Sequence, residues 1–229
     1  MNIQERIASL RETNPFLNKE DIVYNLVLED ILNWRLKSGE RVNQEELSSQ
    51  YNISRSPVRE ALYRLEVEGY LGKNNKGYYV YRLKMEDYLS INEFRIMFEA
   101  YGTRLAAKSI KKEEIQQLKF NMQQMKSIVE QEDMEAFLKL DEEFHLMLIY
   151  ASKNPYLIKT YLQYKEKFHF FRILTTTSQR FPATLAWHEK IYTAVISNNE
   201  ERAARTAIAH LQAMIKTASI ICQNQVLNV

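Results

Sequence analysis

One stretch decides the fold of the first part of this chain: residues 38–71 read SGERVNQEELSSQYNISRSPVREALYRLEVEGYL. Asn43 is placed to cap a short helix, because Glu46 follows three residues later as its reciprocal partner. Ser54 then caps a second helix with Pro57 near its first turn, where a missing N–H costs nothing. The stretch therefore predicts two helices joined by a tight turn.

An amphipathic helix precedes this stretch and a β-hairpin follows it. Apolar residues recur at helical spacing over residues 19–35. Residues 70–83 read YLGKNNKGYYVYRL, which is two short β-prone runs around the turn sequence NNKG. This order of elements predicts a winged helix-turn-helix over residues 19–83. An N-terminal extension, residues 1–18, precedes it and has no assigned role.

The composition of the 229 residues is that of a globular protein. With 45% hydrophobic and 26% charged residues it argues against wholesale disorder, and only 5 Gly and 4 Pro argue against an all-β fold. The single cysteine, Cys222, excludes an intramolecular disulfide and favours a reducing compartment. No signal peptide and no run of roughly 18 apolar residues stands out. We expect a mainly α-helical, cytoplasmic protein without a membrane partner.

The rest of the chain, residues 85–222, predicts an all-helical domain. Apolar spacing and breaks indicate six helices, over residues 85–108, 112–130, 134–152, 155–176, 182–197 and 200–222. Their connections are short, which favours antiparallel neighbours in a bundle.

The second helix of the predicted helix-turn-helix carries the candidate DNA-binding residues. In this motif the second helix lies in the major groove. Arg55 and Arg59 are four residues apart and share one face, and their guanidinium groups can grip a guanine edge or a phosphate. Ser56 can donate to a phosphate, and Lys76 beside Gly77 at the hairpin tip would reach the adjacent minor groove or backbone. The alternative, two solvated surface arginines, is disfavoured by the elements around them.

Polar side chains lie on the apolar faces of three helices of the predicted bundle. Asp141 and His145 share one such face at i and i+4, and His188 and His210 lie on two others. Buried imidazoles are costly when unpaired, so converging polar groups suggest a shared partner. Together they would offer three nitrogens and one oxygen to a divalent metal such as Zn, Ni or Mn. For each histidine the alternative is a hydrogen-bonded core residue, and His169, among phenylalanines, is expected to pack in this way.

The quoted stretch, with the hairpin ending KGYYVY, resembles the N-terminal domain of GntR-type transcription regulators. Two departures are Ser38, where the family usually has Pro, and the pair Asn43-Gln44, where a Leu and an acid are common. Neither affects the arginines that family members use on DNA. The matching residues are Gly39, Glu40, Glu46, Leu47, Ser54, Arg55, Pro57, Val58, Arg59, Glu60, Ala61, Leu62, Leu65, Gly69, Gly77 and Val80.

The helical part resembles the FCD effector domain of the FadR subfamily. The carrying motifs are Asp-x-x-x-His, then HEKIYTAVISNNEERAA, then AIAHL, so the resemblance extends over residues 19–222. It implies that the metal positions of metal-binding members are Asp141, His145, His188 and His210.

Arg95 lies where many members of this subfamily keep an arginine near the effector. On the residue pattern alone it borders an apolar face that includes Phe94 and Phe98. The alternative is an exposed arginine paired with Glu99 four residues later.

The resemblance implies a homodimeric, ligand-responsive transcription regulator, a repressor released by its effector, on a palindromic double-stranded DNA operator. We expect the effector to be a small organic acid, because open positions on a six-coordinate metal suit a carboxylate oxygen. One alternative is a metal-dependent hydrolase with Glu142, Glu143 or Glu189 as general base. Another is a DNA-binding scaffold whose bundle only dimerises. A hydrolase leaves the winged helix-turn-helix unexplained and a scaffold leaves the inward polar groups unexplained, so we do not expect an enzyme.

Overall fold

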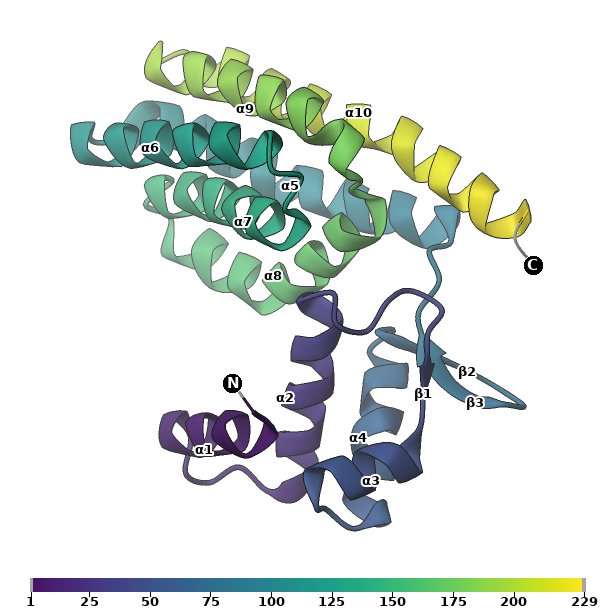
Figure 1. The fold of residues 1–229 in the computed structure, drawn as a ribbon. Coiled ribbons are helices and arrows are strands. Elements are labelled where there is room, and N and C mark those ends of the chain that lie inside the picture. The colour runs from purple at the N-terminus through teal and green to yellow at the C-terminus, as the bar shows by residue number, and fades with distance from the viewer. Residues whose placement is uncertain (1, 228–229) are drawn as a thin grey trace. The chain divides into compact units, whose positions relative to one another are not determined.

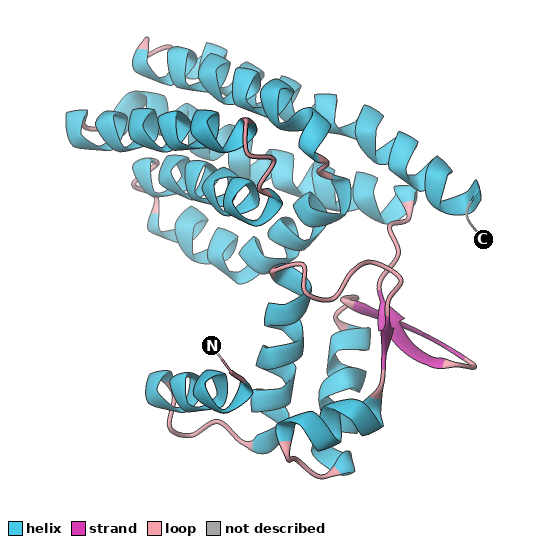
Figure 2. Ribbon diagram, in the orientation of Figure 1, coloured by secondary structure: helices cyan, strands magenta, loops and turns pink. Residues whose placement is uncertain are grey.

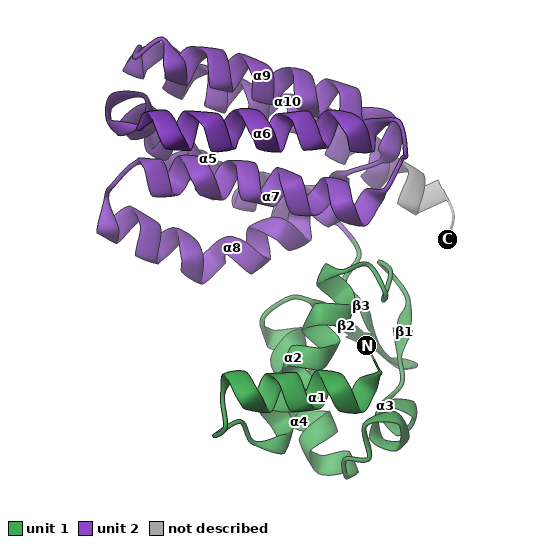
Figure 3. Cartoon of the chain, turned by 60° about the vertical axis from the view of Figure 1, so that its left-hand side comes forward, with its two compact units in different colours: residues 1–82 green, residues 83–229 purple. Residues whose placement is uncertain are grey.

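A computed structural model describes residues 2–227 of the chain, with side chains up to residue 223. These residues form ten α-helices, one 3-10 turn and one three-stranded sheet (Figures 1 and 2). The chain divides into two compact units, residues 1–82 and 83–229 (Figure 3). Among the described residues, no helix is both long enough and apolar enough to cross a membrane.

The first unit is a winged helix-turn-helix, as the sequence predicts. The small sheet has the order β1-β3-β2 and is antiparallel throughout, so a short strand before α3 pairs with the hairpin as an edge of the sheet. The elements are α1 (Ile3–Thr13), α2 (Lys19–Leu32), β1 (Arg41–Val42), α3 (Gln44–Tyr51), α4 (Arg55–Val67), β2 (Leu71–Asn74) and β3 (Gly77–Val80).

Polar side chains fix the turn between α3 and α4. The Asn43 side chain accepts from the Glu45 N–H at 2.9 Å, so Asn43 caps the helix as expected. Glu46 is not the reciprocal partner of a capping box, because it accepts from the Asn43 side chain, at 2.9 Å, and not from the Asn43 backbone N–H. Asn52 ends α3 in the left-handed region with φ 52°, which Asn tolerates better than most residues. Ser54 occupies the N-cap of α4, but its side chain makes no capping hydrogen bond.

The N-terminal extension contains a helix that sequence reasoning left unassigned. Asn2 and Glu5 form a capping box at the start of α1. Arg6 then pairs with Glu29 at 3.0 Å and with Asp30 at 2.7 Å, both on α2. The Arg6 side chain is mostly buried, so these ion pairs connect α1 to the winged helix-turn-helix.

The second unit is the expected antiparallel six-helix bundle. Its short turns include Glu132, Lys153 and Asn198, which adopt left-handed conformations with φ between 53° and 56°. The last helix runs further than the predicted end at Cys222. The elements are α5 (Met85–Ser109), α6 (Lys112–Val129), α7 (Met134–Ala151), α8 (Pro155–Thr175), the 3-10 turn η1 (Ser178–Arg180), α9 (Phe181–Ile196) and α10 (Glu200–Leu227).

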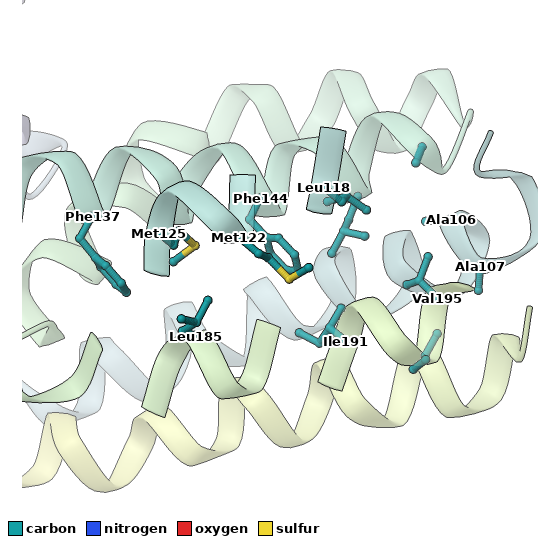
Figure 4. Packing of buried hydrophobic residues seen from close by; sticks show 14 of the residues in the cluster. Ala106, Ala107, Leu118, Met122, Met125, Phe137, Phe144, Leu185, Ile191 and Val195 are labelled. Carbon is teal, nitrogen blue, oxygen red and sulfur yellow. The ribbon is translucent and has the colours of Figure 1, made fainter. Parts of the chain in front are cut away.

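Apolar side chains of α6, α7 and α9 form the main core of the bundle (Figure 4). Phe137 of α7 stacks on Phe181 of α9 with ring centroids 3.8 Å apart. A second cluster lies between α5 and α8, where Phe94 and Phe98 pack around Phe168. Phe94 and Phe98 are only partly buried, so the expected apolar face of α5 is not its most buried face. The most buried face of α5 is polar.

Candidate metal centre and DNA-binding surface

Three histidines from three helices meet inside the bundle. One nitrogen each of His145 on α7, His188 on α9 and His210 on α10 lie within 4.8 Å of one another. The three side chains are buried, with His188 0% exposed. Their ring centroids are 5.1 to 5.4 Å apart. The structure therefore brings together the three histidines that the sequence pattern selected.

Asp141 lies at the edge of this group. Its Oδ1 atom is 3.3 Å from His188 Nε2 and 4.0 Å from His145 Nε2. The i, i+4 spacing on α7 puts Asp141 and His145 on one inward face, as expected. Phe144, between them in sequence, stacks on His188 with centroids 4.0 Å apart and holds that imidazole in place.

Several nitrogens of this group have no hydrogen-bond partner among the described residues. They are His145 Nε2, both ring nitrogens of His188 and His210 Nδ1. Burial holds the pKa values of His188 and His210 well below their usual range, and the neighbouring His145 adds to this effect. Neutral imidazoles with unused lone pairs, beside a carboxylate, are the donor set that a borderline divalent cation takes. The residues fit a metal.

Glu99 of α5 fixes the orientation of His145. Its Oε2 atom lies 2.9 Å from His145 Nδ1, so the imidazole donates through Nδ1 and leaves Nε2 to face the other histidines. Burial alone would raise the pKa of Glu99, but Arg95, His145 and Arg172 together hold it well below its usual range. Glu99 is thus an ionised second-layer carboxylate of the kind that orients metal-binding histidines.

The surroundings of Glu99 contain residues that sequence reasoning missed. Its Oε1 atom accepts from Arg95 Nε at 3.1 Å, from Tyr161 Oη at 3.2 Å and from an Arg172 Nη at 3.1 Å. Tyr161 and Arg172, both on α8, are buried. The sequence pattern places Arg95 only at the border of an apolar face, with an exposed Arg95–Glu99 pair as the alternative, so it does not predict a buried polar network.

Arg172 links this network to the metal-site carboxylate. Its Nε atom lies 3.2 Å from Asp141 Oδ2, yet without hydrogen-bond geometry, and its Nη1 atom is buried without a partner among the described residues. Two guanidinium groups, Arg95 and Arg172, therefore face two carboxylates, Glu99 and Asp141, in the interior. The buried charges balance before any ion binds.

The other candidate residues of the bundle are found in different settings. Arg95 does pair with Glu99, but the pair is buried rather than exposed. His169 is buried and lies 3.3 Å from Glu142, as expected for a packed histidine. Glu189, one of the candidate general bases of the hydrolase alternative, is exposed on α9, at a surface hollow.

The two candidate arginines of α4 project from the first unit into solvent. The Arg55 side chain is 76% exposed and pairs with Glu45 at 3.0 Å, and that of Arg59 is 64% exposed and pairs with Glu60 at 3.0 Å. Ser56, one residue beyond Arg55, is also exposed. Exposed ion pairs of this kind contribute at most about 1 kcal/mol, so both arginines can exchange their partners for phosphate or base edges.

The wing contributes a separate basic surface. Lys76 is exposed at the tip of the β2–β3 hairpin, and Gly77 has φ +110°, a conformation that strains any other residue. Both line a hollow of about 330 Å³ together with Arg41 and Arg82. Three cations around one concave surface of the winged unit suit a negatively charged backbone.

Two family models match the chain. Residues 19–80 match the gntR family of bacterial regulatory proteins, and residues 90–213 match the FCD domain. The second match contains all four candidate metal ligands and Arg95.

Named relatives span nearly the same length. The Nta operon transcriptional regulator of Aminobacter aminovorans is 33% identical over 183 residues, which cover 79% of this chain and 85% of the relative. The HTH-type transcriptional repressor RspR of Escherichia coli is 25% identical over 214 residues, covering 93% of this chain and 94% of RspR.

The fold also has a counterpart among solved structures. A transcriptional regulator GntR from Rhodococcus sp. RHA1 superimposes with a TM-score of 0.71 at 18% identity. The superposition covers 87% of this chain and 96% of the other. The likeness concerns the arrangement of the helices and the wing.

Proposed function

This chain belongs to the GntR family of bacterial regulatory proteins, contains an FCD domain and is a transcription regulator; from this premise we propose that it is a repressor whose bundle binds a divalent metal and a small carboxylate effector. The similar proteins are transcription regulators and not hydrolases, which argues against the metal-dependent hydrolase. A scaffold that only dimerises gives no reason for the buried histidine nitrogens without hydrogen-bond partners, which cost stability.

The observation that carries the proposal is the group of unpartnered imidazole nitrogens inside the bundle. The proposed ligands are Asp141 Oδ1, His145 Nε2, His188 and His210. Each lone pair buried without a partner destabilises the fold by about 1–3 kcal/mol, and a bound cation would remove that cost for all of them. When bound, the metal supplies a positive centre that attracts an anion.

The balance of charge points to an acid as the effector. Arg95 and Arg172 already neutralise Glu99 and Asp141, so a divalent cation leaves the interior with an uncompensated positive charge. A carboxylate bound to the metal would offset this excess in a region of low dielectric. Arg95, expected as the effector arginine, is held by Glu99, and the free Nη1 of Arg172 is placed to contribute.

The winged unit is the proposed DNA reader. Arg55, Ser56 and Arg59 lie on the exposed side of α4, and Lys76 and Gly77 form the tip of the wing. One α4 helix reads one half-site, so a palindromic operator requires a homodimer. Action on DNA and a single free thiol together support the cytoplasm as the proposed site of action.

A stripe along α5 is suited to pair with a second copy of the chain. Met97 is 68% exposed and Tyr101 is 49% exposed near the middle of the helix. Toward the N-terminus of α5 the same stripe carries the acids Glu86 and Glu93. Toward the C-terminus it carries the bases Arg104 and Lys108. Two antiparallel α5 helices related by a two-fold axis near Met97 would set acids against bases around an apolar centre.

The effector controls DNA binding only through unequal affinity for two states of the dimer. A repressor is released when the effector binds the DNA-free state more tightly than the DNA-bound state. A shift from nearly full occupancy to nearly none requires a preference of about 10⁴-fold, or about 5.5 kcal/mol.

Operator selection followed by an effector titration tests the proposal. An operator is selected from random duplex DNA with the metal-loaded protein, and its affinity is measured by fluorescence anisotropy at fixed salt, with and without a panel of hydroxy acids and dicarboxylates. We expect a palindromic operator and at least one acid that weakens binding tenfold or more. An operator affinity that no acid and no chelator changes would contradict the proposal.

A further inference from the structure

The buried face of α5 carries polar side chains over residues 88–103. Its members recur at helical spacing, and each is at most 3% exposed: Tyr88, Asn92, Arg95, Glu99 and Thr103. Arg95 and Glu99 belong to the network around His145. Asn92 and Tyr88 lie about one and about two turns closer to the start of the helix than Arg95, outside that network.

Two polar atoms at this end of α5 lack partners. The Asn92 side chain donates through Nδ2 to the Leu211 carbonyl of α10 at 3.3 Å, but its Oδ1 atom has no hydrogen-bond partner among the described residues. The Tyr88 hydroxyl is likewise buried. Thr175 lies beside it, but no described residue forms a hydrogen bond of ordinary geometry with this hydroxyl. Tyr88 and Asn92 are each 1% exposed, so water outside the protein does not satisfy these atoms.

A cation without an acidic partner completes the group. Arg180, at the end of η1, lies beyond ion-pair distance of every carboxylate in the described part of the chain. Its Nη2 atom instead lies 3.9 Å from the Met214 sulfur on α10, and its charge acts on Tyr88. Leu211 and Met214 are one turn apart on α10, so Asn92 and Arg180 meet neighbouring turns of the same helix.

We propose that Tyr88, Asn92 and Arg180 form a second subsite that binds the far carboxylate of a dicarboxylic effector. The inference rests on the proposed function, because the near carboxylate would bind at the histidine cluster. Arg180 would pair with the far carboxylate through its guanidinium, and the Tyr88 hydroxyl would donate to it. Asn92 Oδ1, which can only accept, would accept a hydrogen bond from a hydroxyl group of the ligand.

The spacing along α10 limits the length of the ligand. His210 and Met214 are one helical turn apart, or about 6 Å along the helix axis. Because Arg180 lies beside Met214, we take this rise as the scale of the separation between the two anionic ends of the ligand. A separation on this scale favours a short carbon chain. A dicarboxylate of that length can also reach Arg180 with its second carboxylate, which a monocarboxylate of equal length lacks.

Matched pairs of acids test the subsite. Dissociation constants of the metal-loaded protein are measured by calorimetry for succinate against butyrate, glutarate against valerate and adipate against hexanoate. We expect at least one dicarboxylate to bind at least about tenfold more tightly than its partner, as a charged hydrogen bond implies. In Arg180→Gln this preference disappears, while the monocarboxylate affinity and the metal content stay unchanged.

Arg205→Gln, which removes an exposed cation from α10, is the matched control and should keep the preference. Tyr88→Phe keeps the ring and removes the hydroxyl, and it should reduce the preference without unfolding the bundle. If both members of every pair bind equally and metal removal abolishes both, the subsite is wrong and the carboxylate effector stands. If no acid binds the metal-loaded wild type, both the subsite and the carboxylate effector are wrong.

Discussion

His145 Nδ1 and Glu99 Oε2 lie 2.9 Å apart in the interior of the bundle, and each side chain is 4% exposed. The contact joins α7 to α5 and determines which nitrogen of His145 remains available. Because Glu99 also accepts from Arg95, Tyr161 and Arg172, one carboxylate couples the histidine cluster to the two buried arginines. The proposed metal site and the proposed effector site therefore share a structural element.

Changing Glu99 to Gln should weaken metal binding. The amide cannot hold the Nδ1 proton of His145 as a carboxylate does, and loss of such an outer partner typically reduces metal affinity 10- to 100-fold. Two arginines also lose their charged partner, so the free energy of unfolding should fall by about 3–5 kcal/mol. Metal affinity is measured by competition with a chromophoric chelator, on protein that retains its helical circular dichroism. Glu166→Gln, which removes an exposed carboxylate from α8 outside the α5 stripe, should leave both quantities unchanged.

The metal-free protein should lose stability as the pH falls below about 6.5. His188 and His210 have depressed pKa values when folded, whereas in the unfolded chain they titrate near 6.5. The unfolded state therefore binds more protons below that pH, and the free energy of unfolding falls by about 1.4 kcal/mol per pH unit for each histidine. Urea unfolding between pH 5 and pH 8, in the presence of chelator, measures this slope. A flat profile over this range would show that the two imidazoles are not buried as neutral groups.

Arg59→Ala should abolish specific operator binding without affecting the fold. A lost base contact costs about 1–3 kcal/mol and a dimer loses two, so affinity should fall by about thirtyfold or more. Arg11→Ala, which removes an exposed arginine from α1 of the same unit, is the control. Anisotropy titrations at one salt concentration, with thermal unfolding of each variant, provide the measurement. Equal operator affinity of both variants would remove Arg59 from the reading surface.

Met97→Arg should dissociate the proposed dimer. A charge placed at the centre of the apolar part of the α5 stripe would lie beside its own copy across the two-fold axis, at a cost of about 2 kcal/mol or more. Phe120→Arg puts the same charge on another exposed apolar position, on α6, where 60% of the residue is exposed. Analytical ultracentrifugation should find a monomer for the first variant and a dimer for the second. A dimer in both would place the interface elsewhere.

The fold could be predicted almost entirely from local signals. The caps, the turn at Asn52 and the hairpin around residues 74–77 each act within a few residues, so the sequence contains them in readable form. The helix of the N-terminal extension was missed even though Asn2 and Glu5 form a capping box. Its position depends on ion pairs from Arg6 to α2, which local patterns do not reveal.

The candidate site could be predicted only in part. Asp141, His145, His188 and His210 stand out because each is a polar residue in an otherwise apolar stripe. Glu99 does not stand out, because in α5 the polar residues themselves form the buried face. Hydrophobic periodicity therefore predicts the wrong face of α5 as the buried one. Burial of Glu99 is tolerated because Arg172 of α8 pairs with it, a contact that the sequence pattern does not reveal.

Metal analysis of two histidine variants tests most directly whether the histidine cluster binds a metal. Wild type, His188→Ala and His169→Ala are stripped with chelator, reloaded with Zn, Ni or Mn, desalted and analysed by mass spectrometry. His169 is the matched control, because it is also a buried histidine of the bundle but lies beside Glu142. We predict an equimolar amount of metal and a raised melting temperature in wild type and His169→Ala, and loss of both in His188→Ala. Wild-type protein that retains no metal, or a His188→Ala variant that retains it in full, would contradict the account.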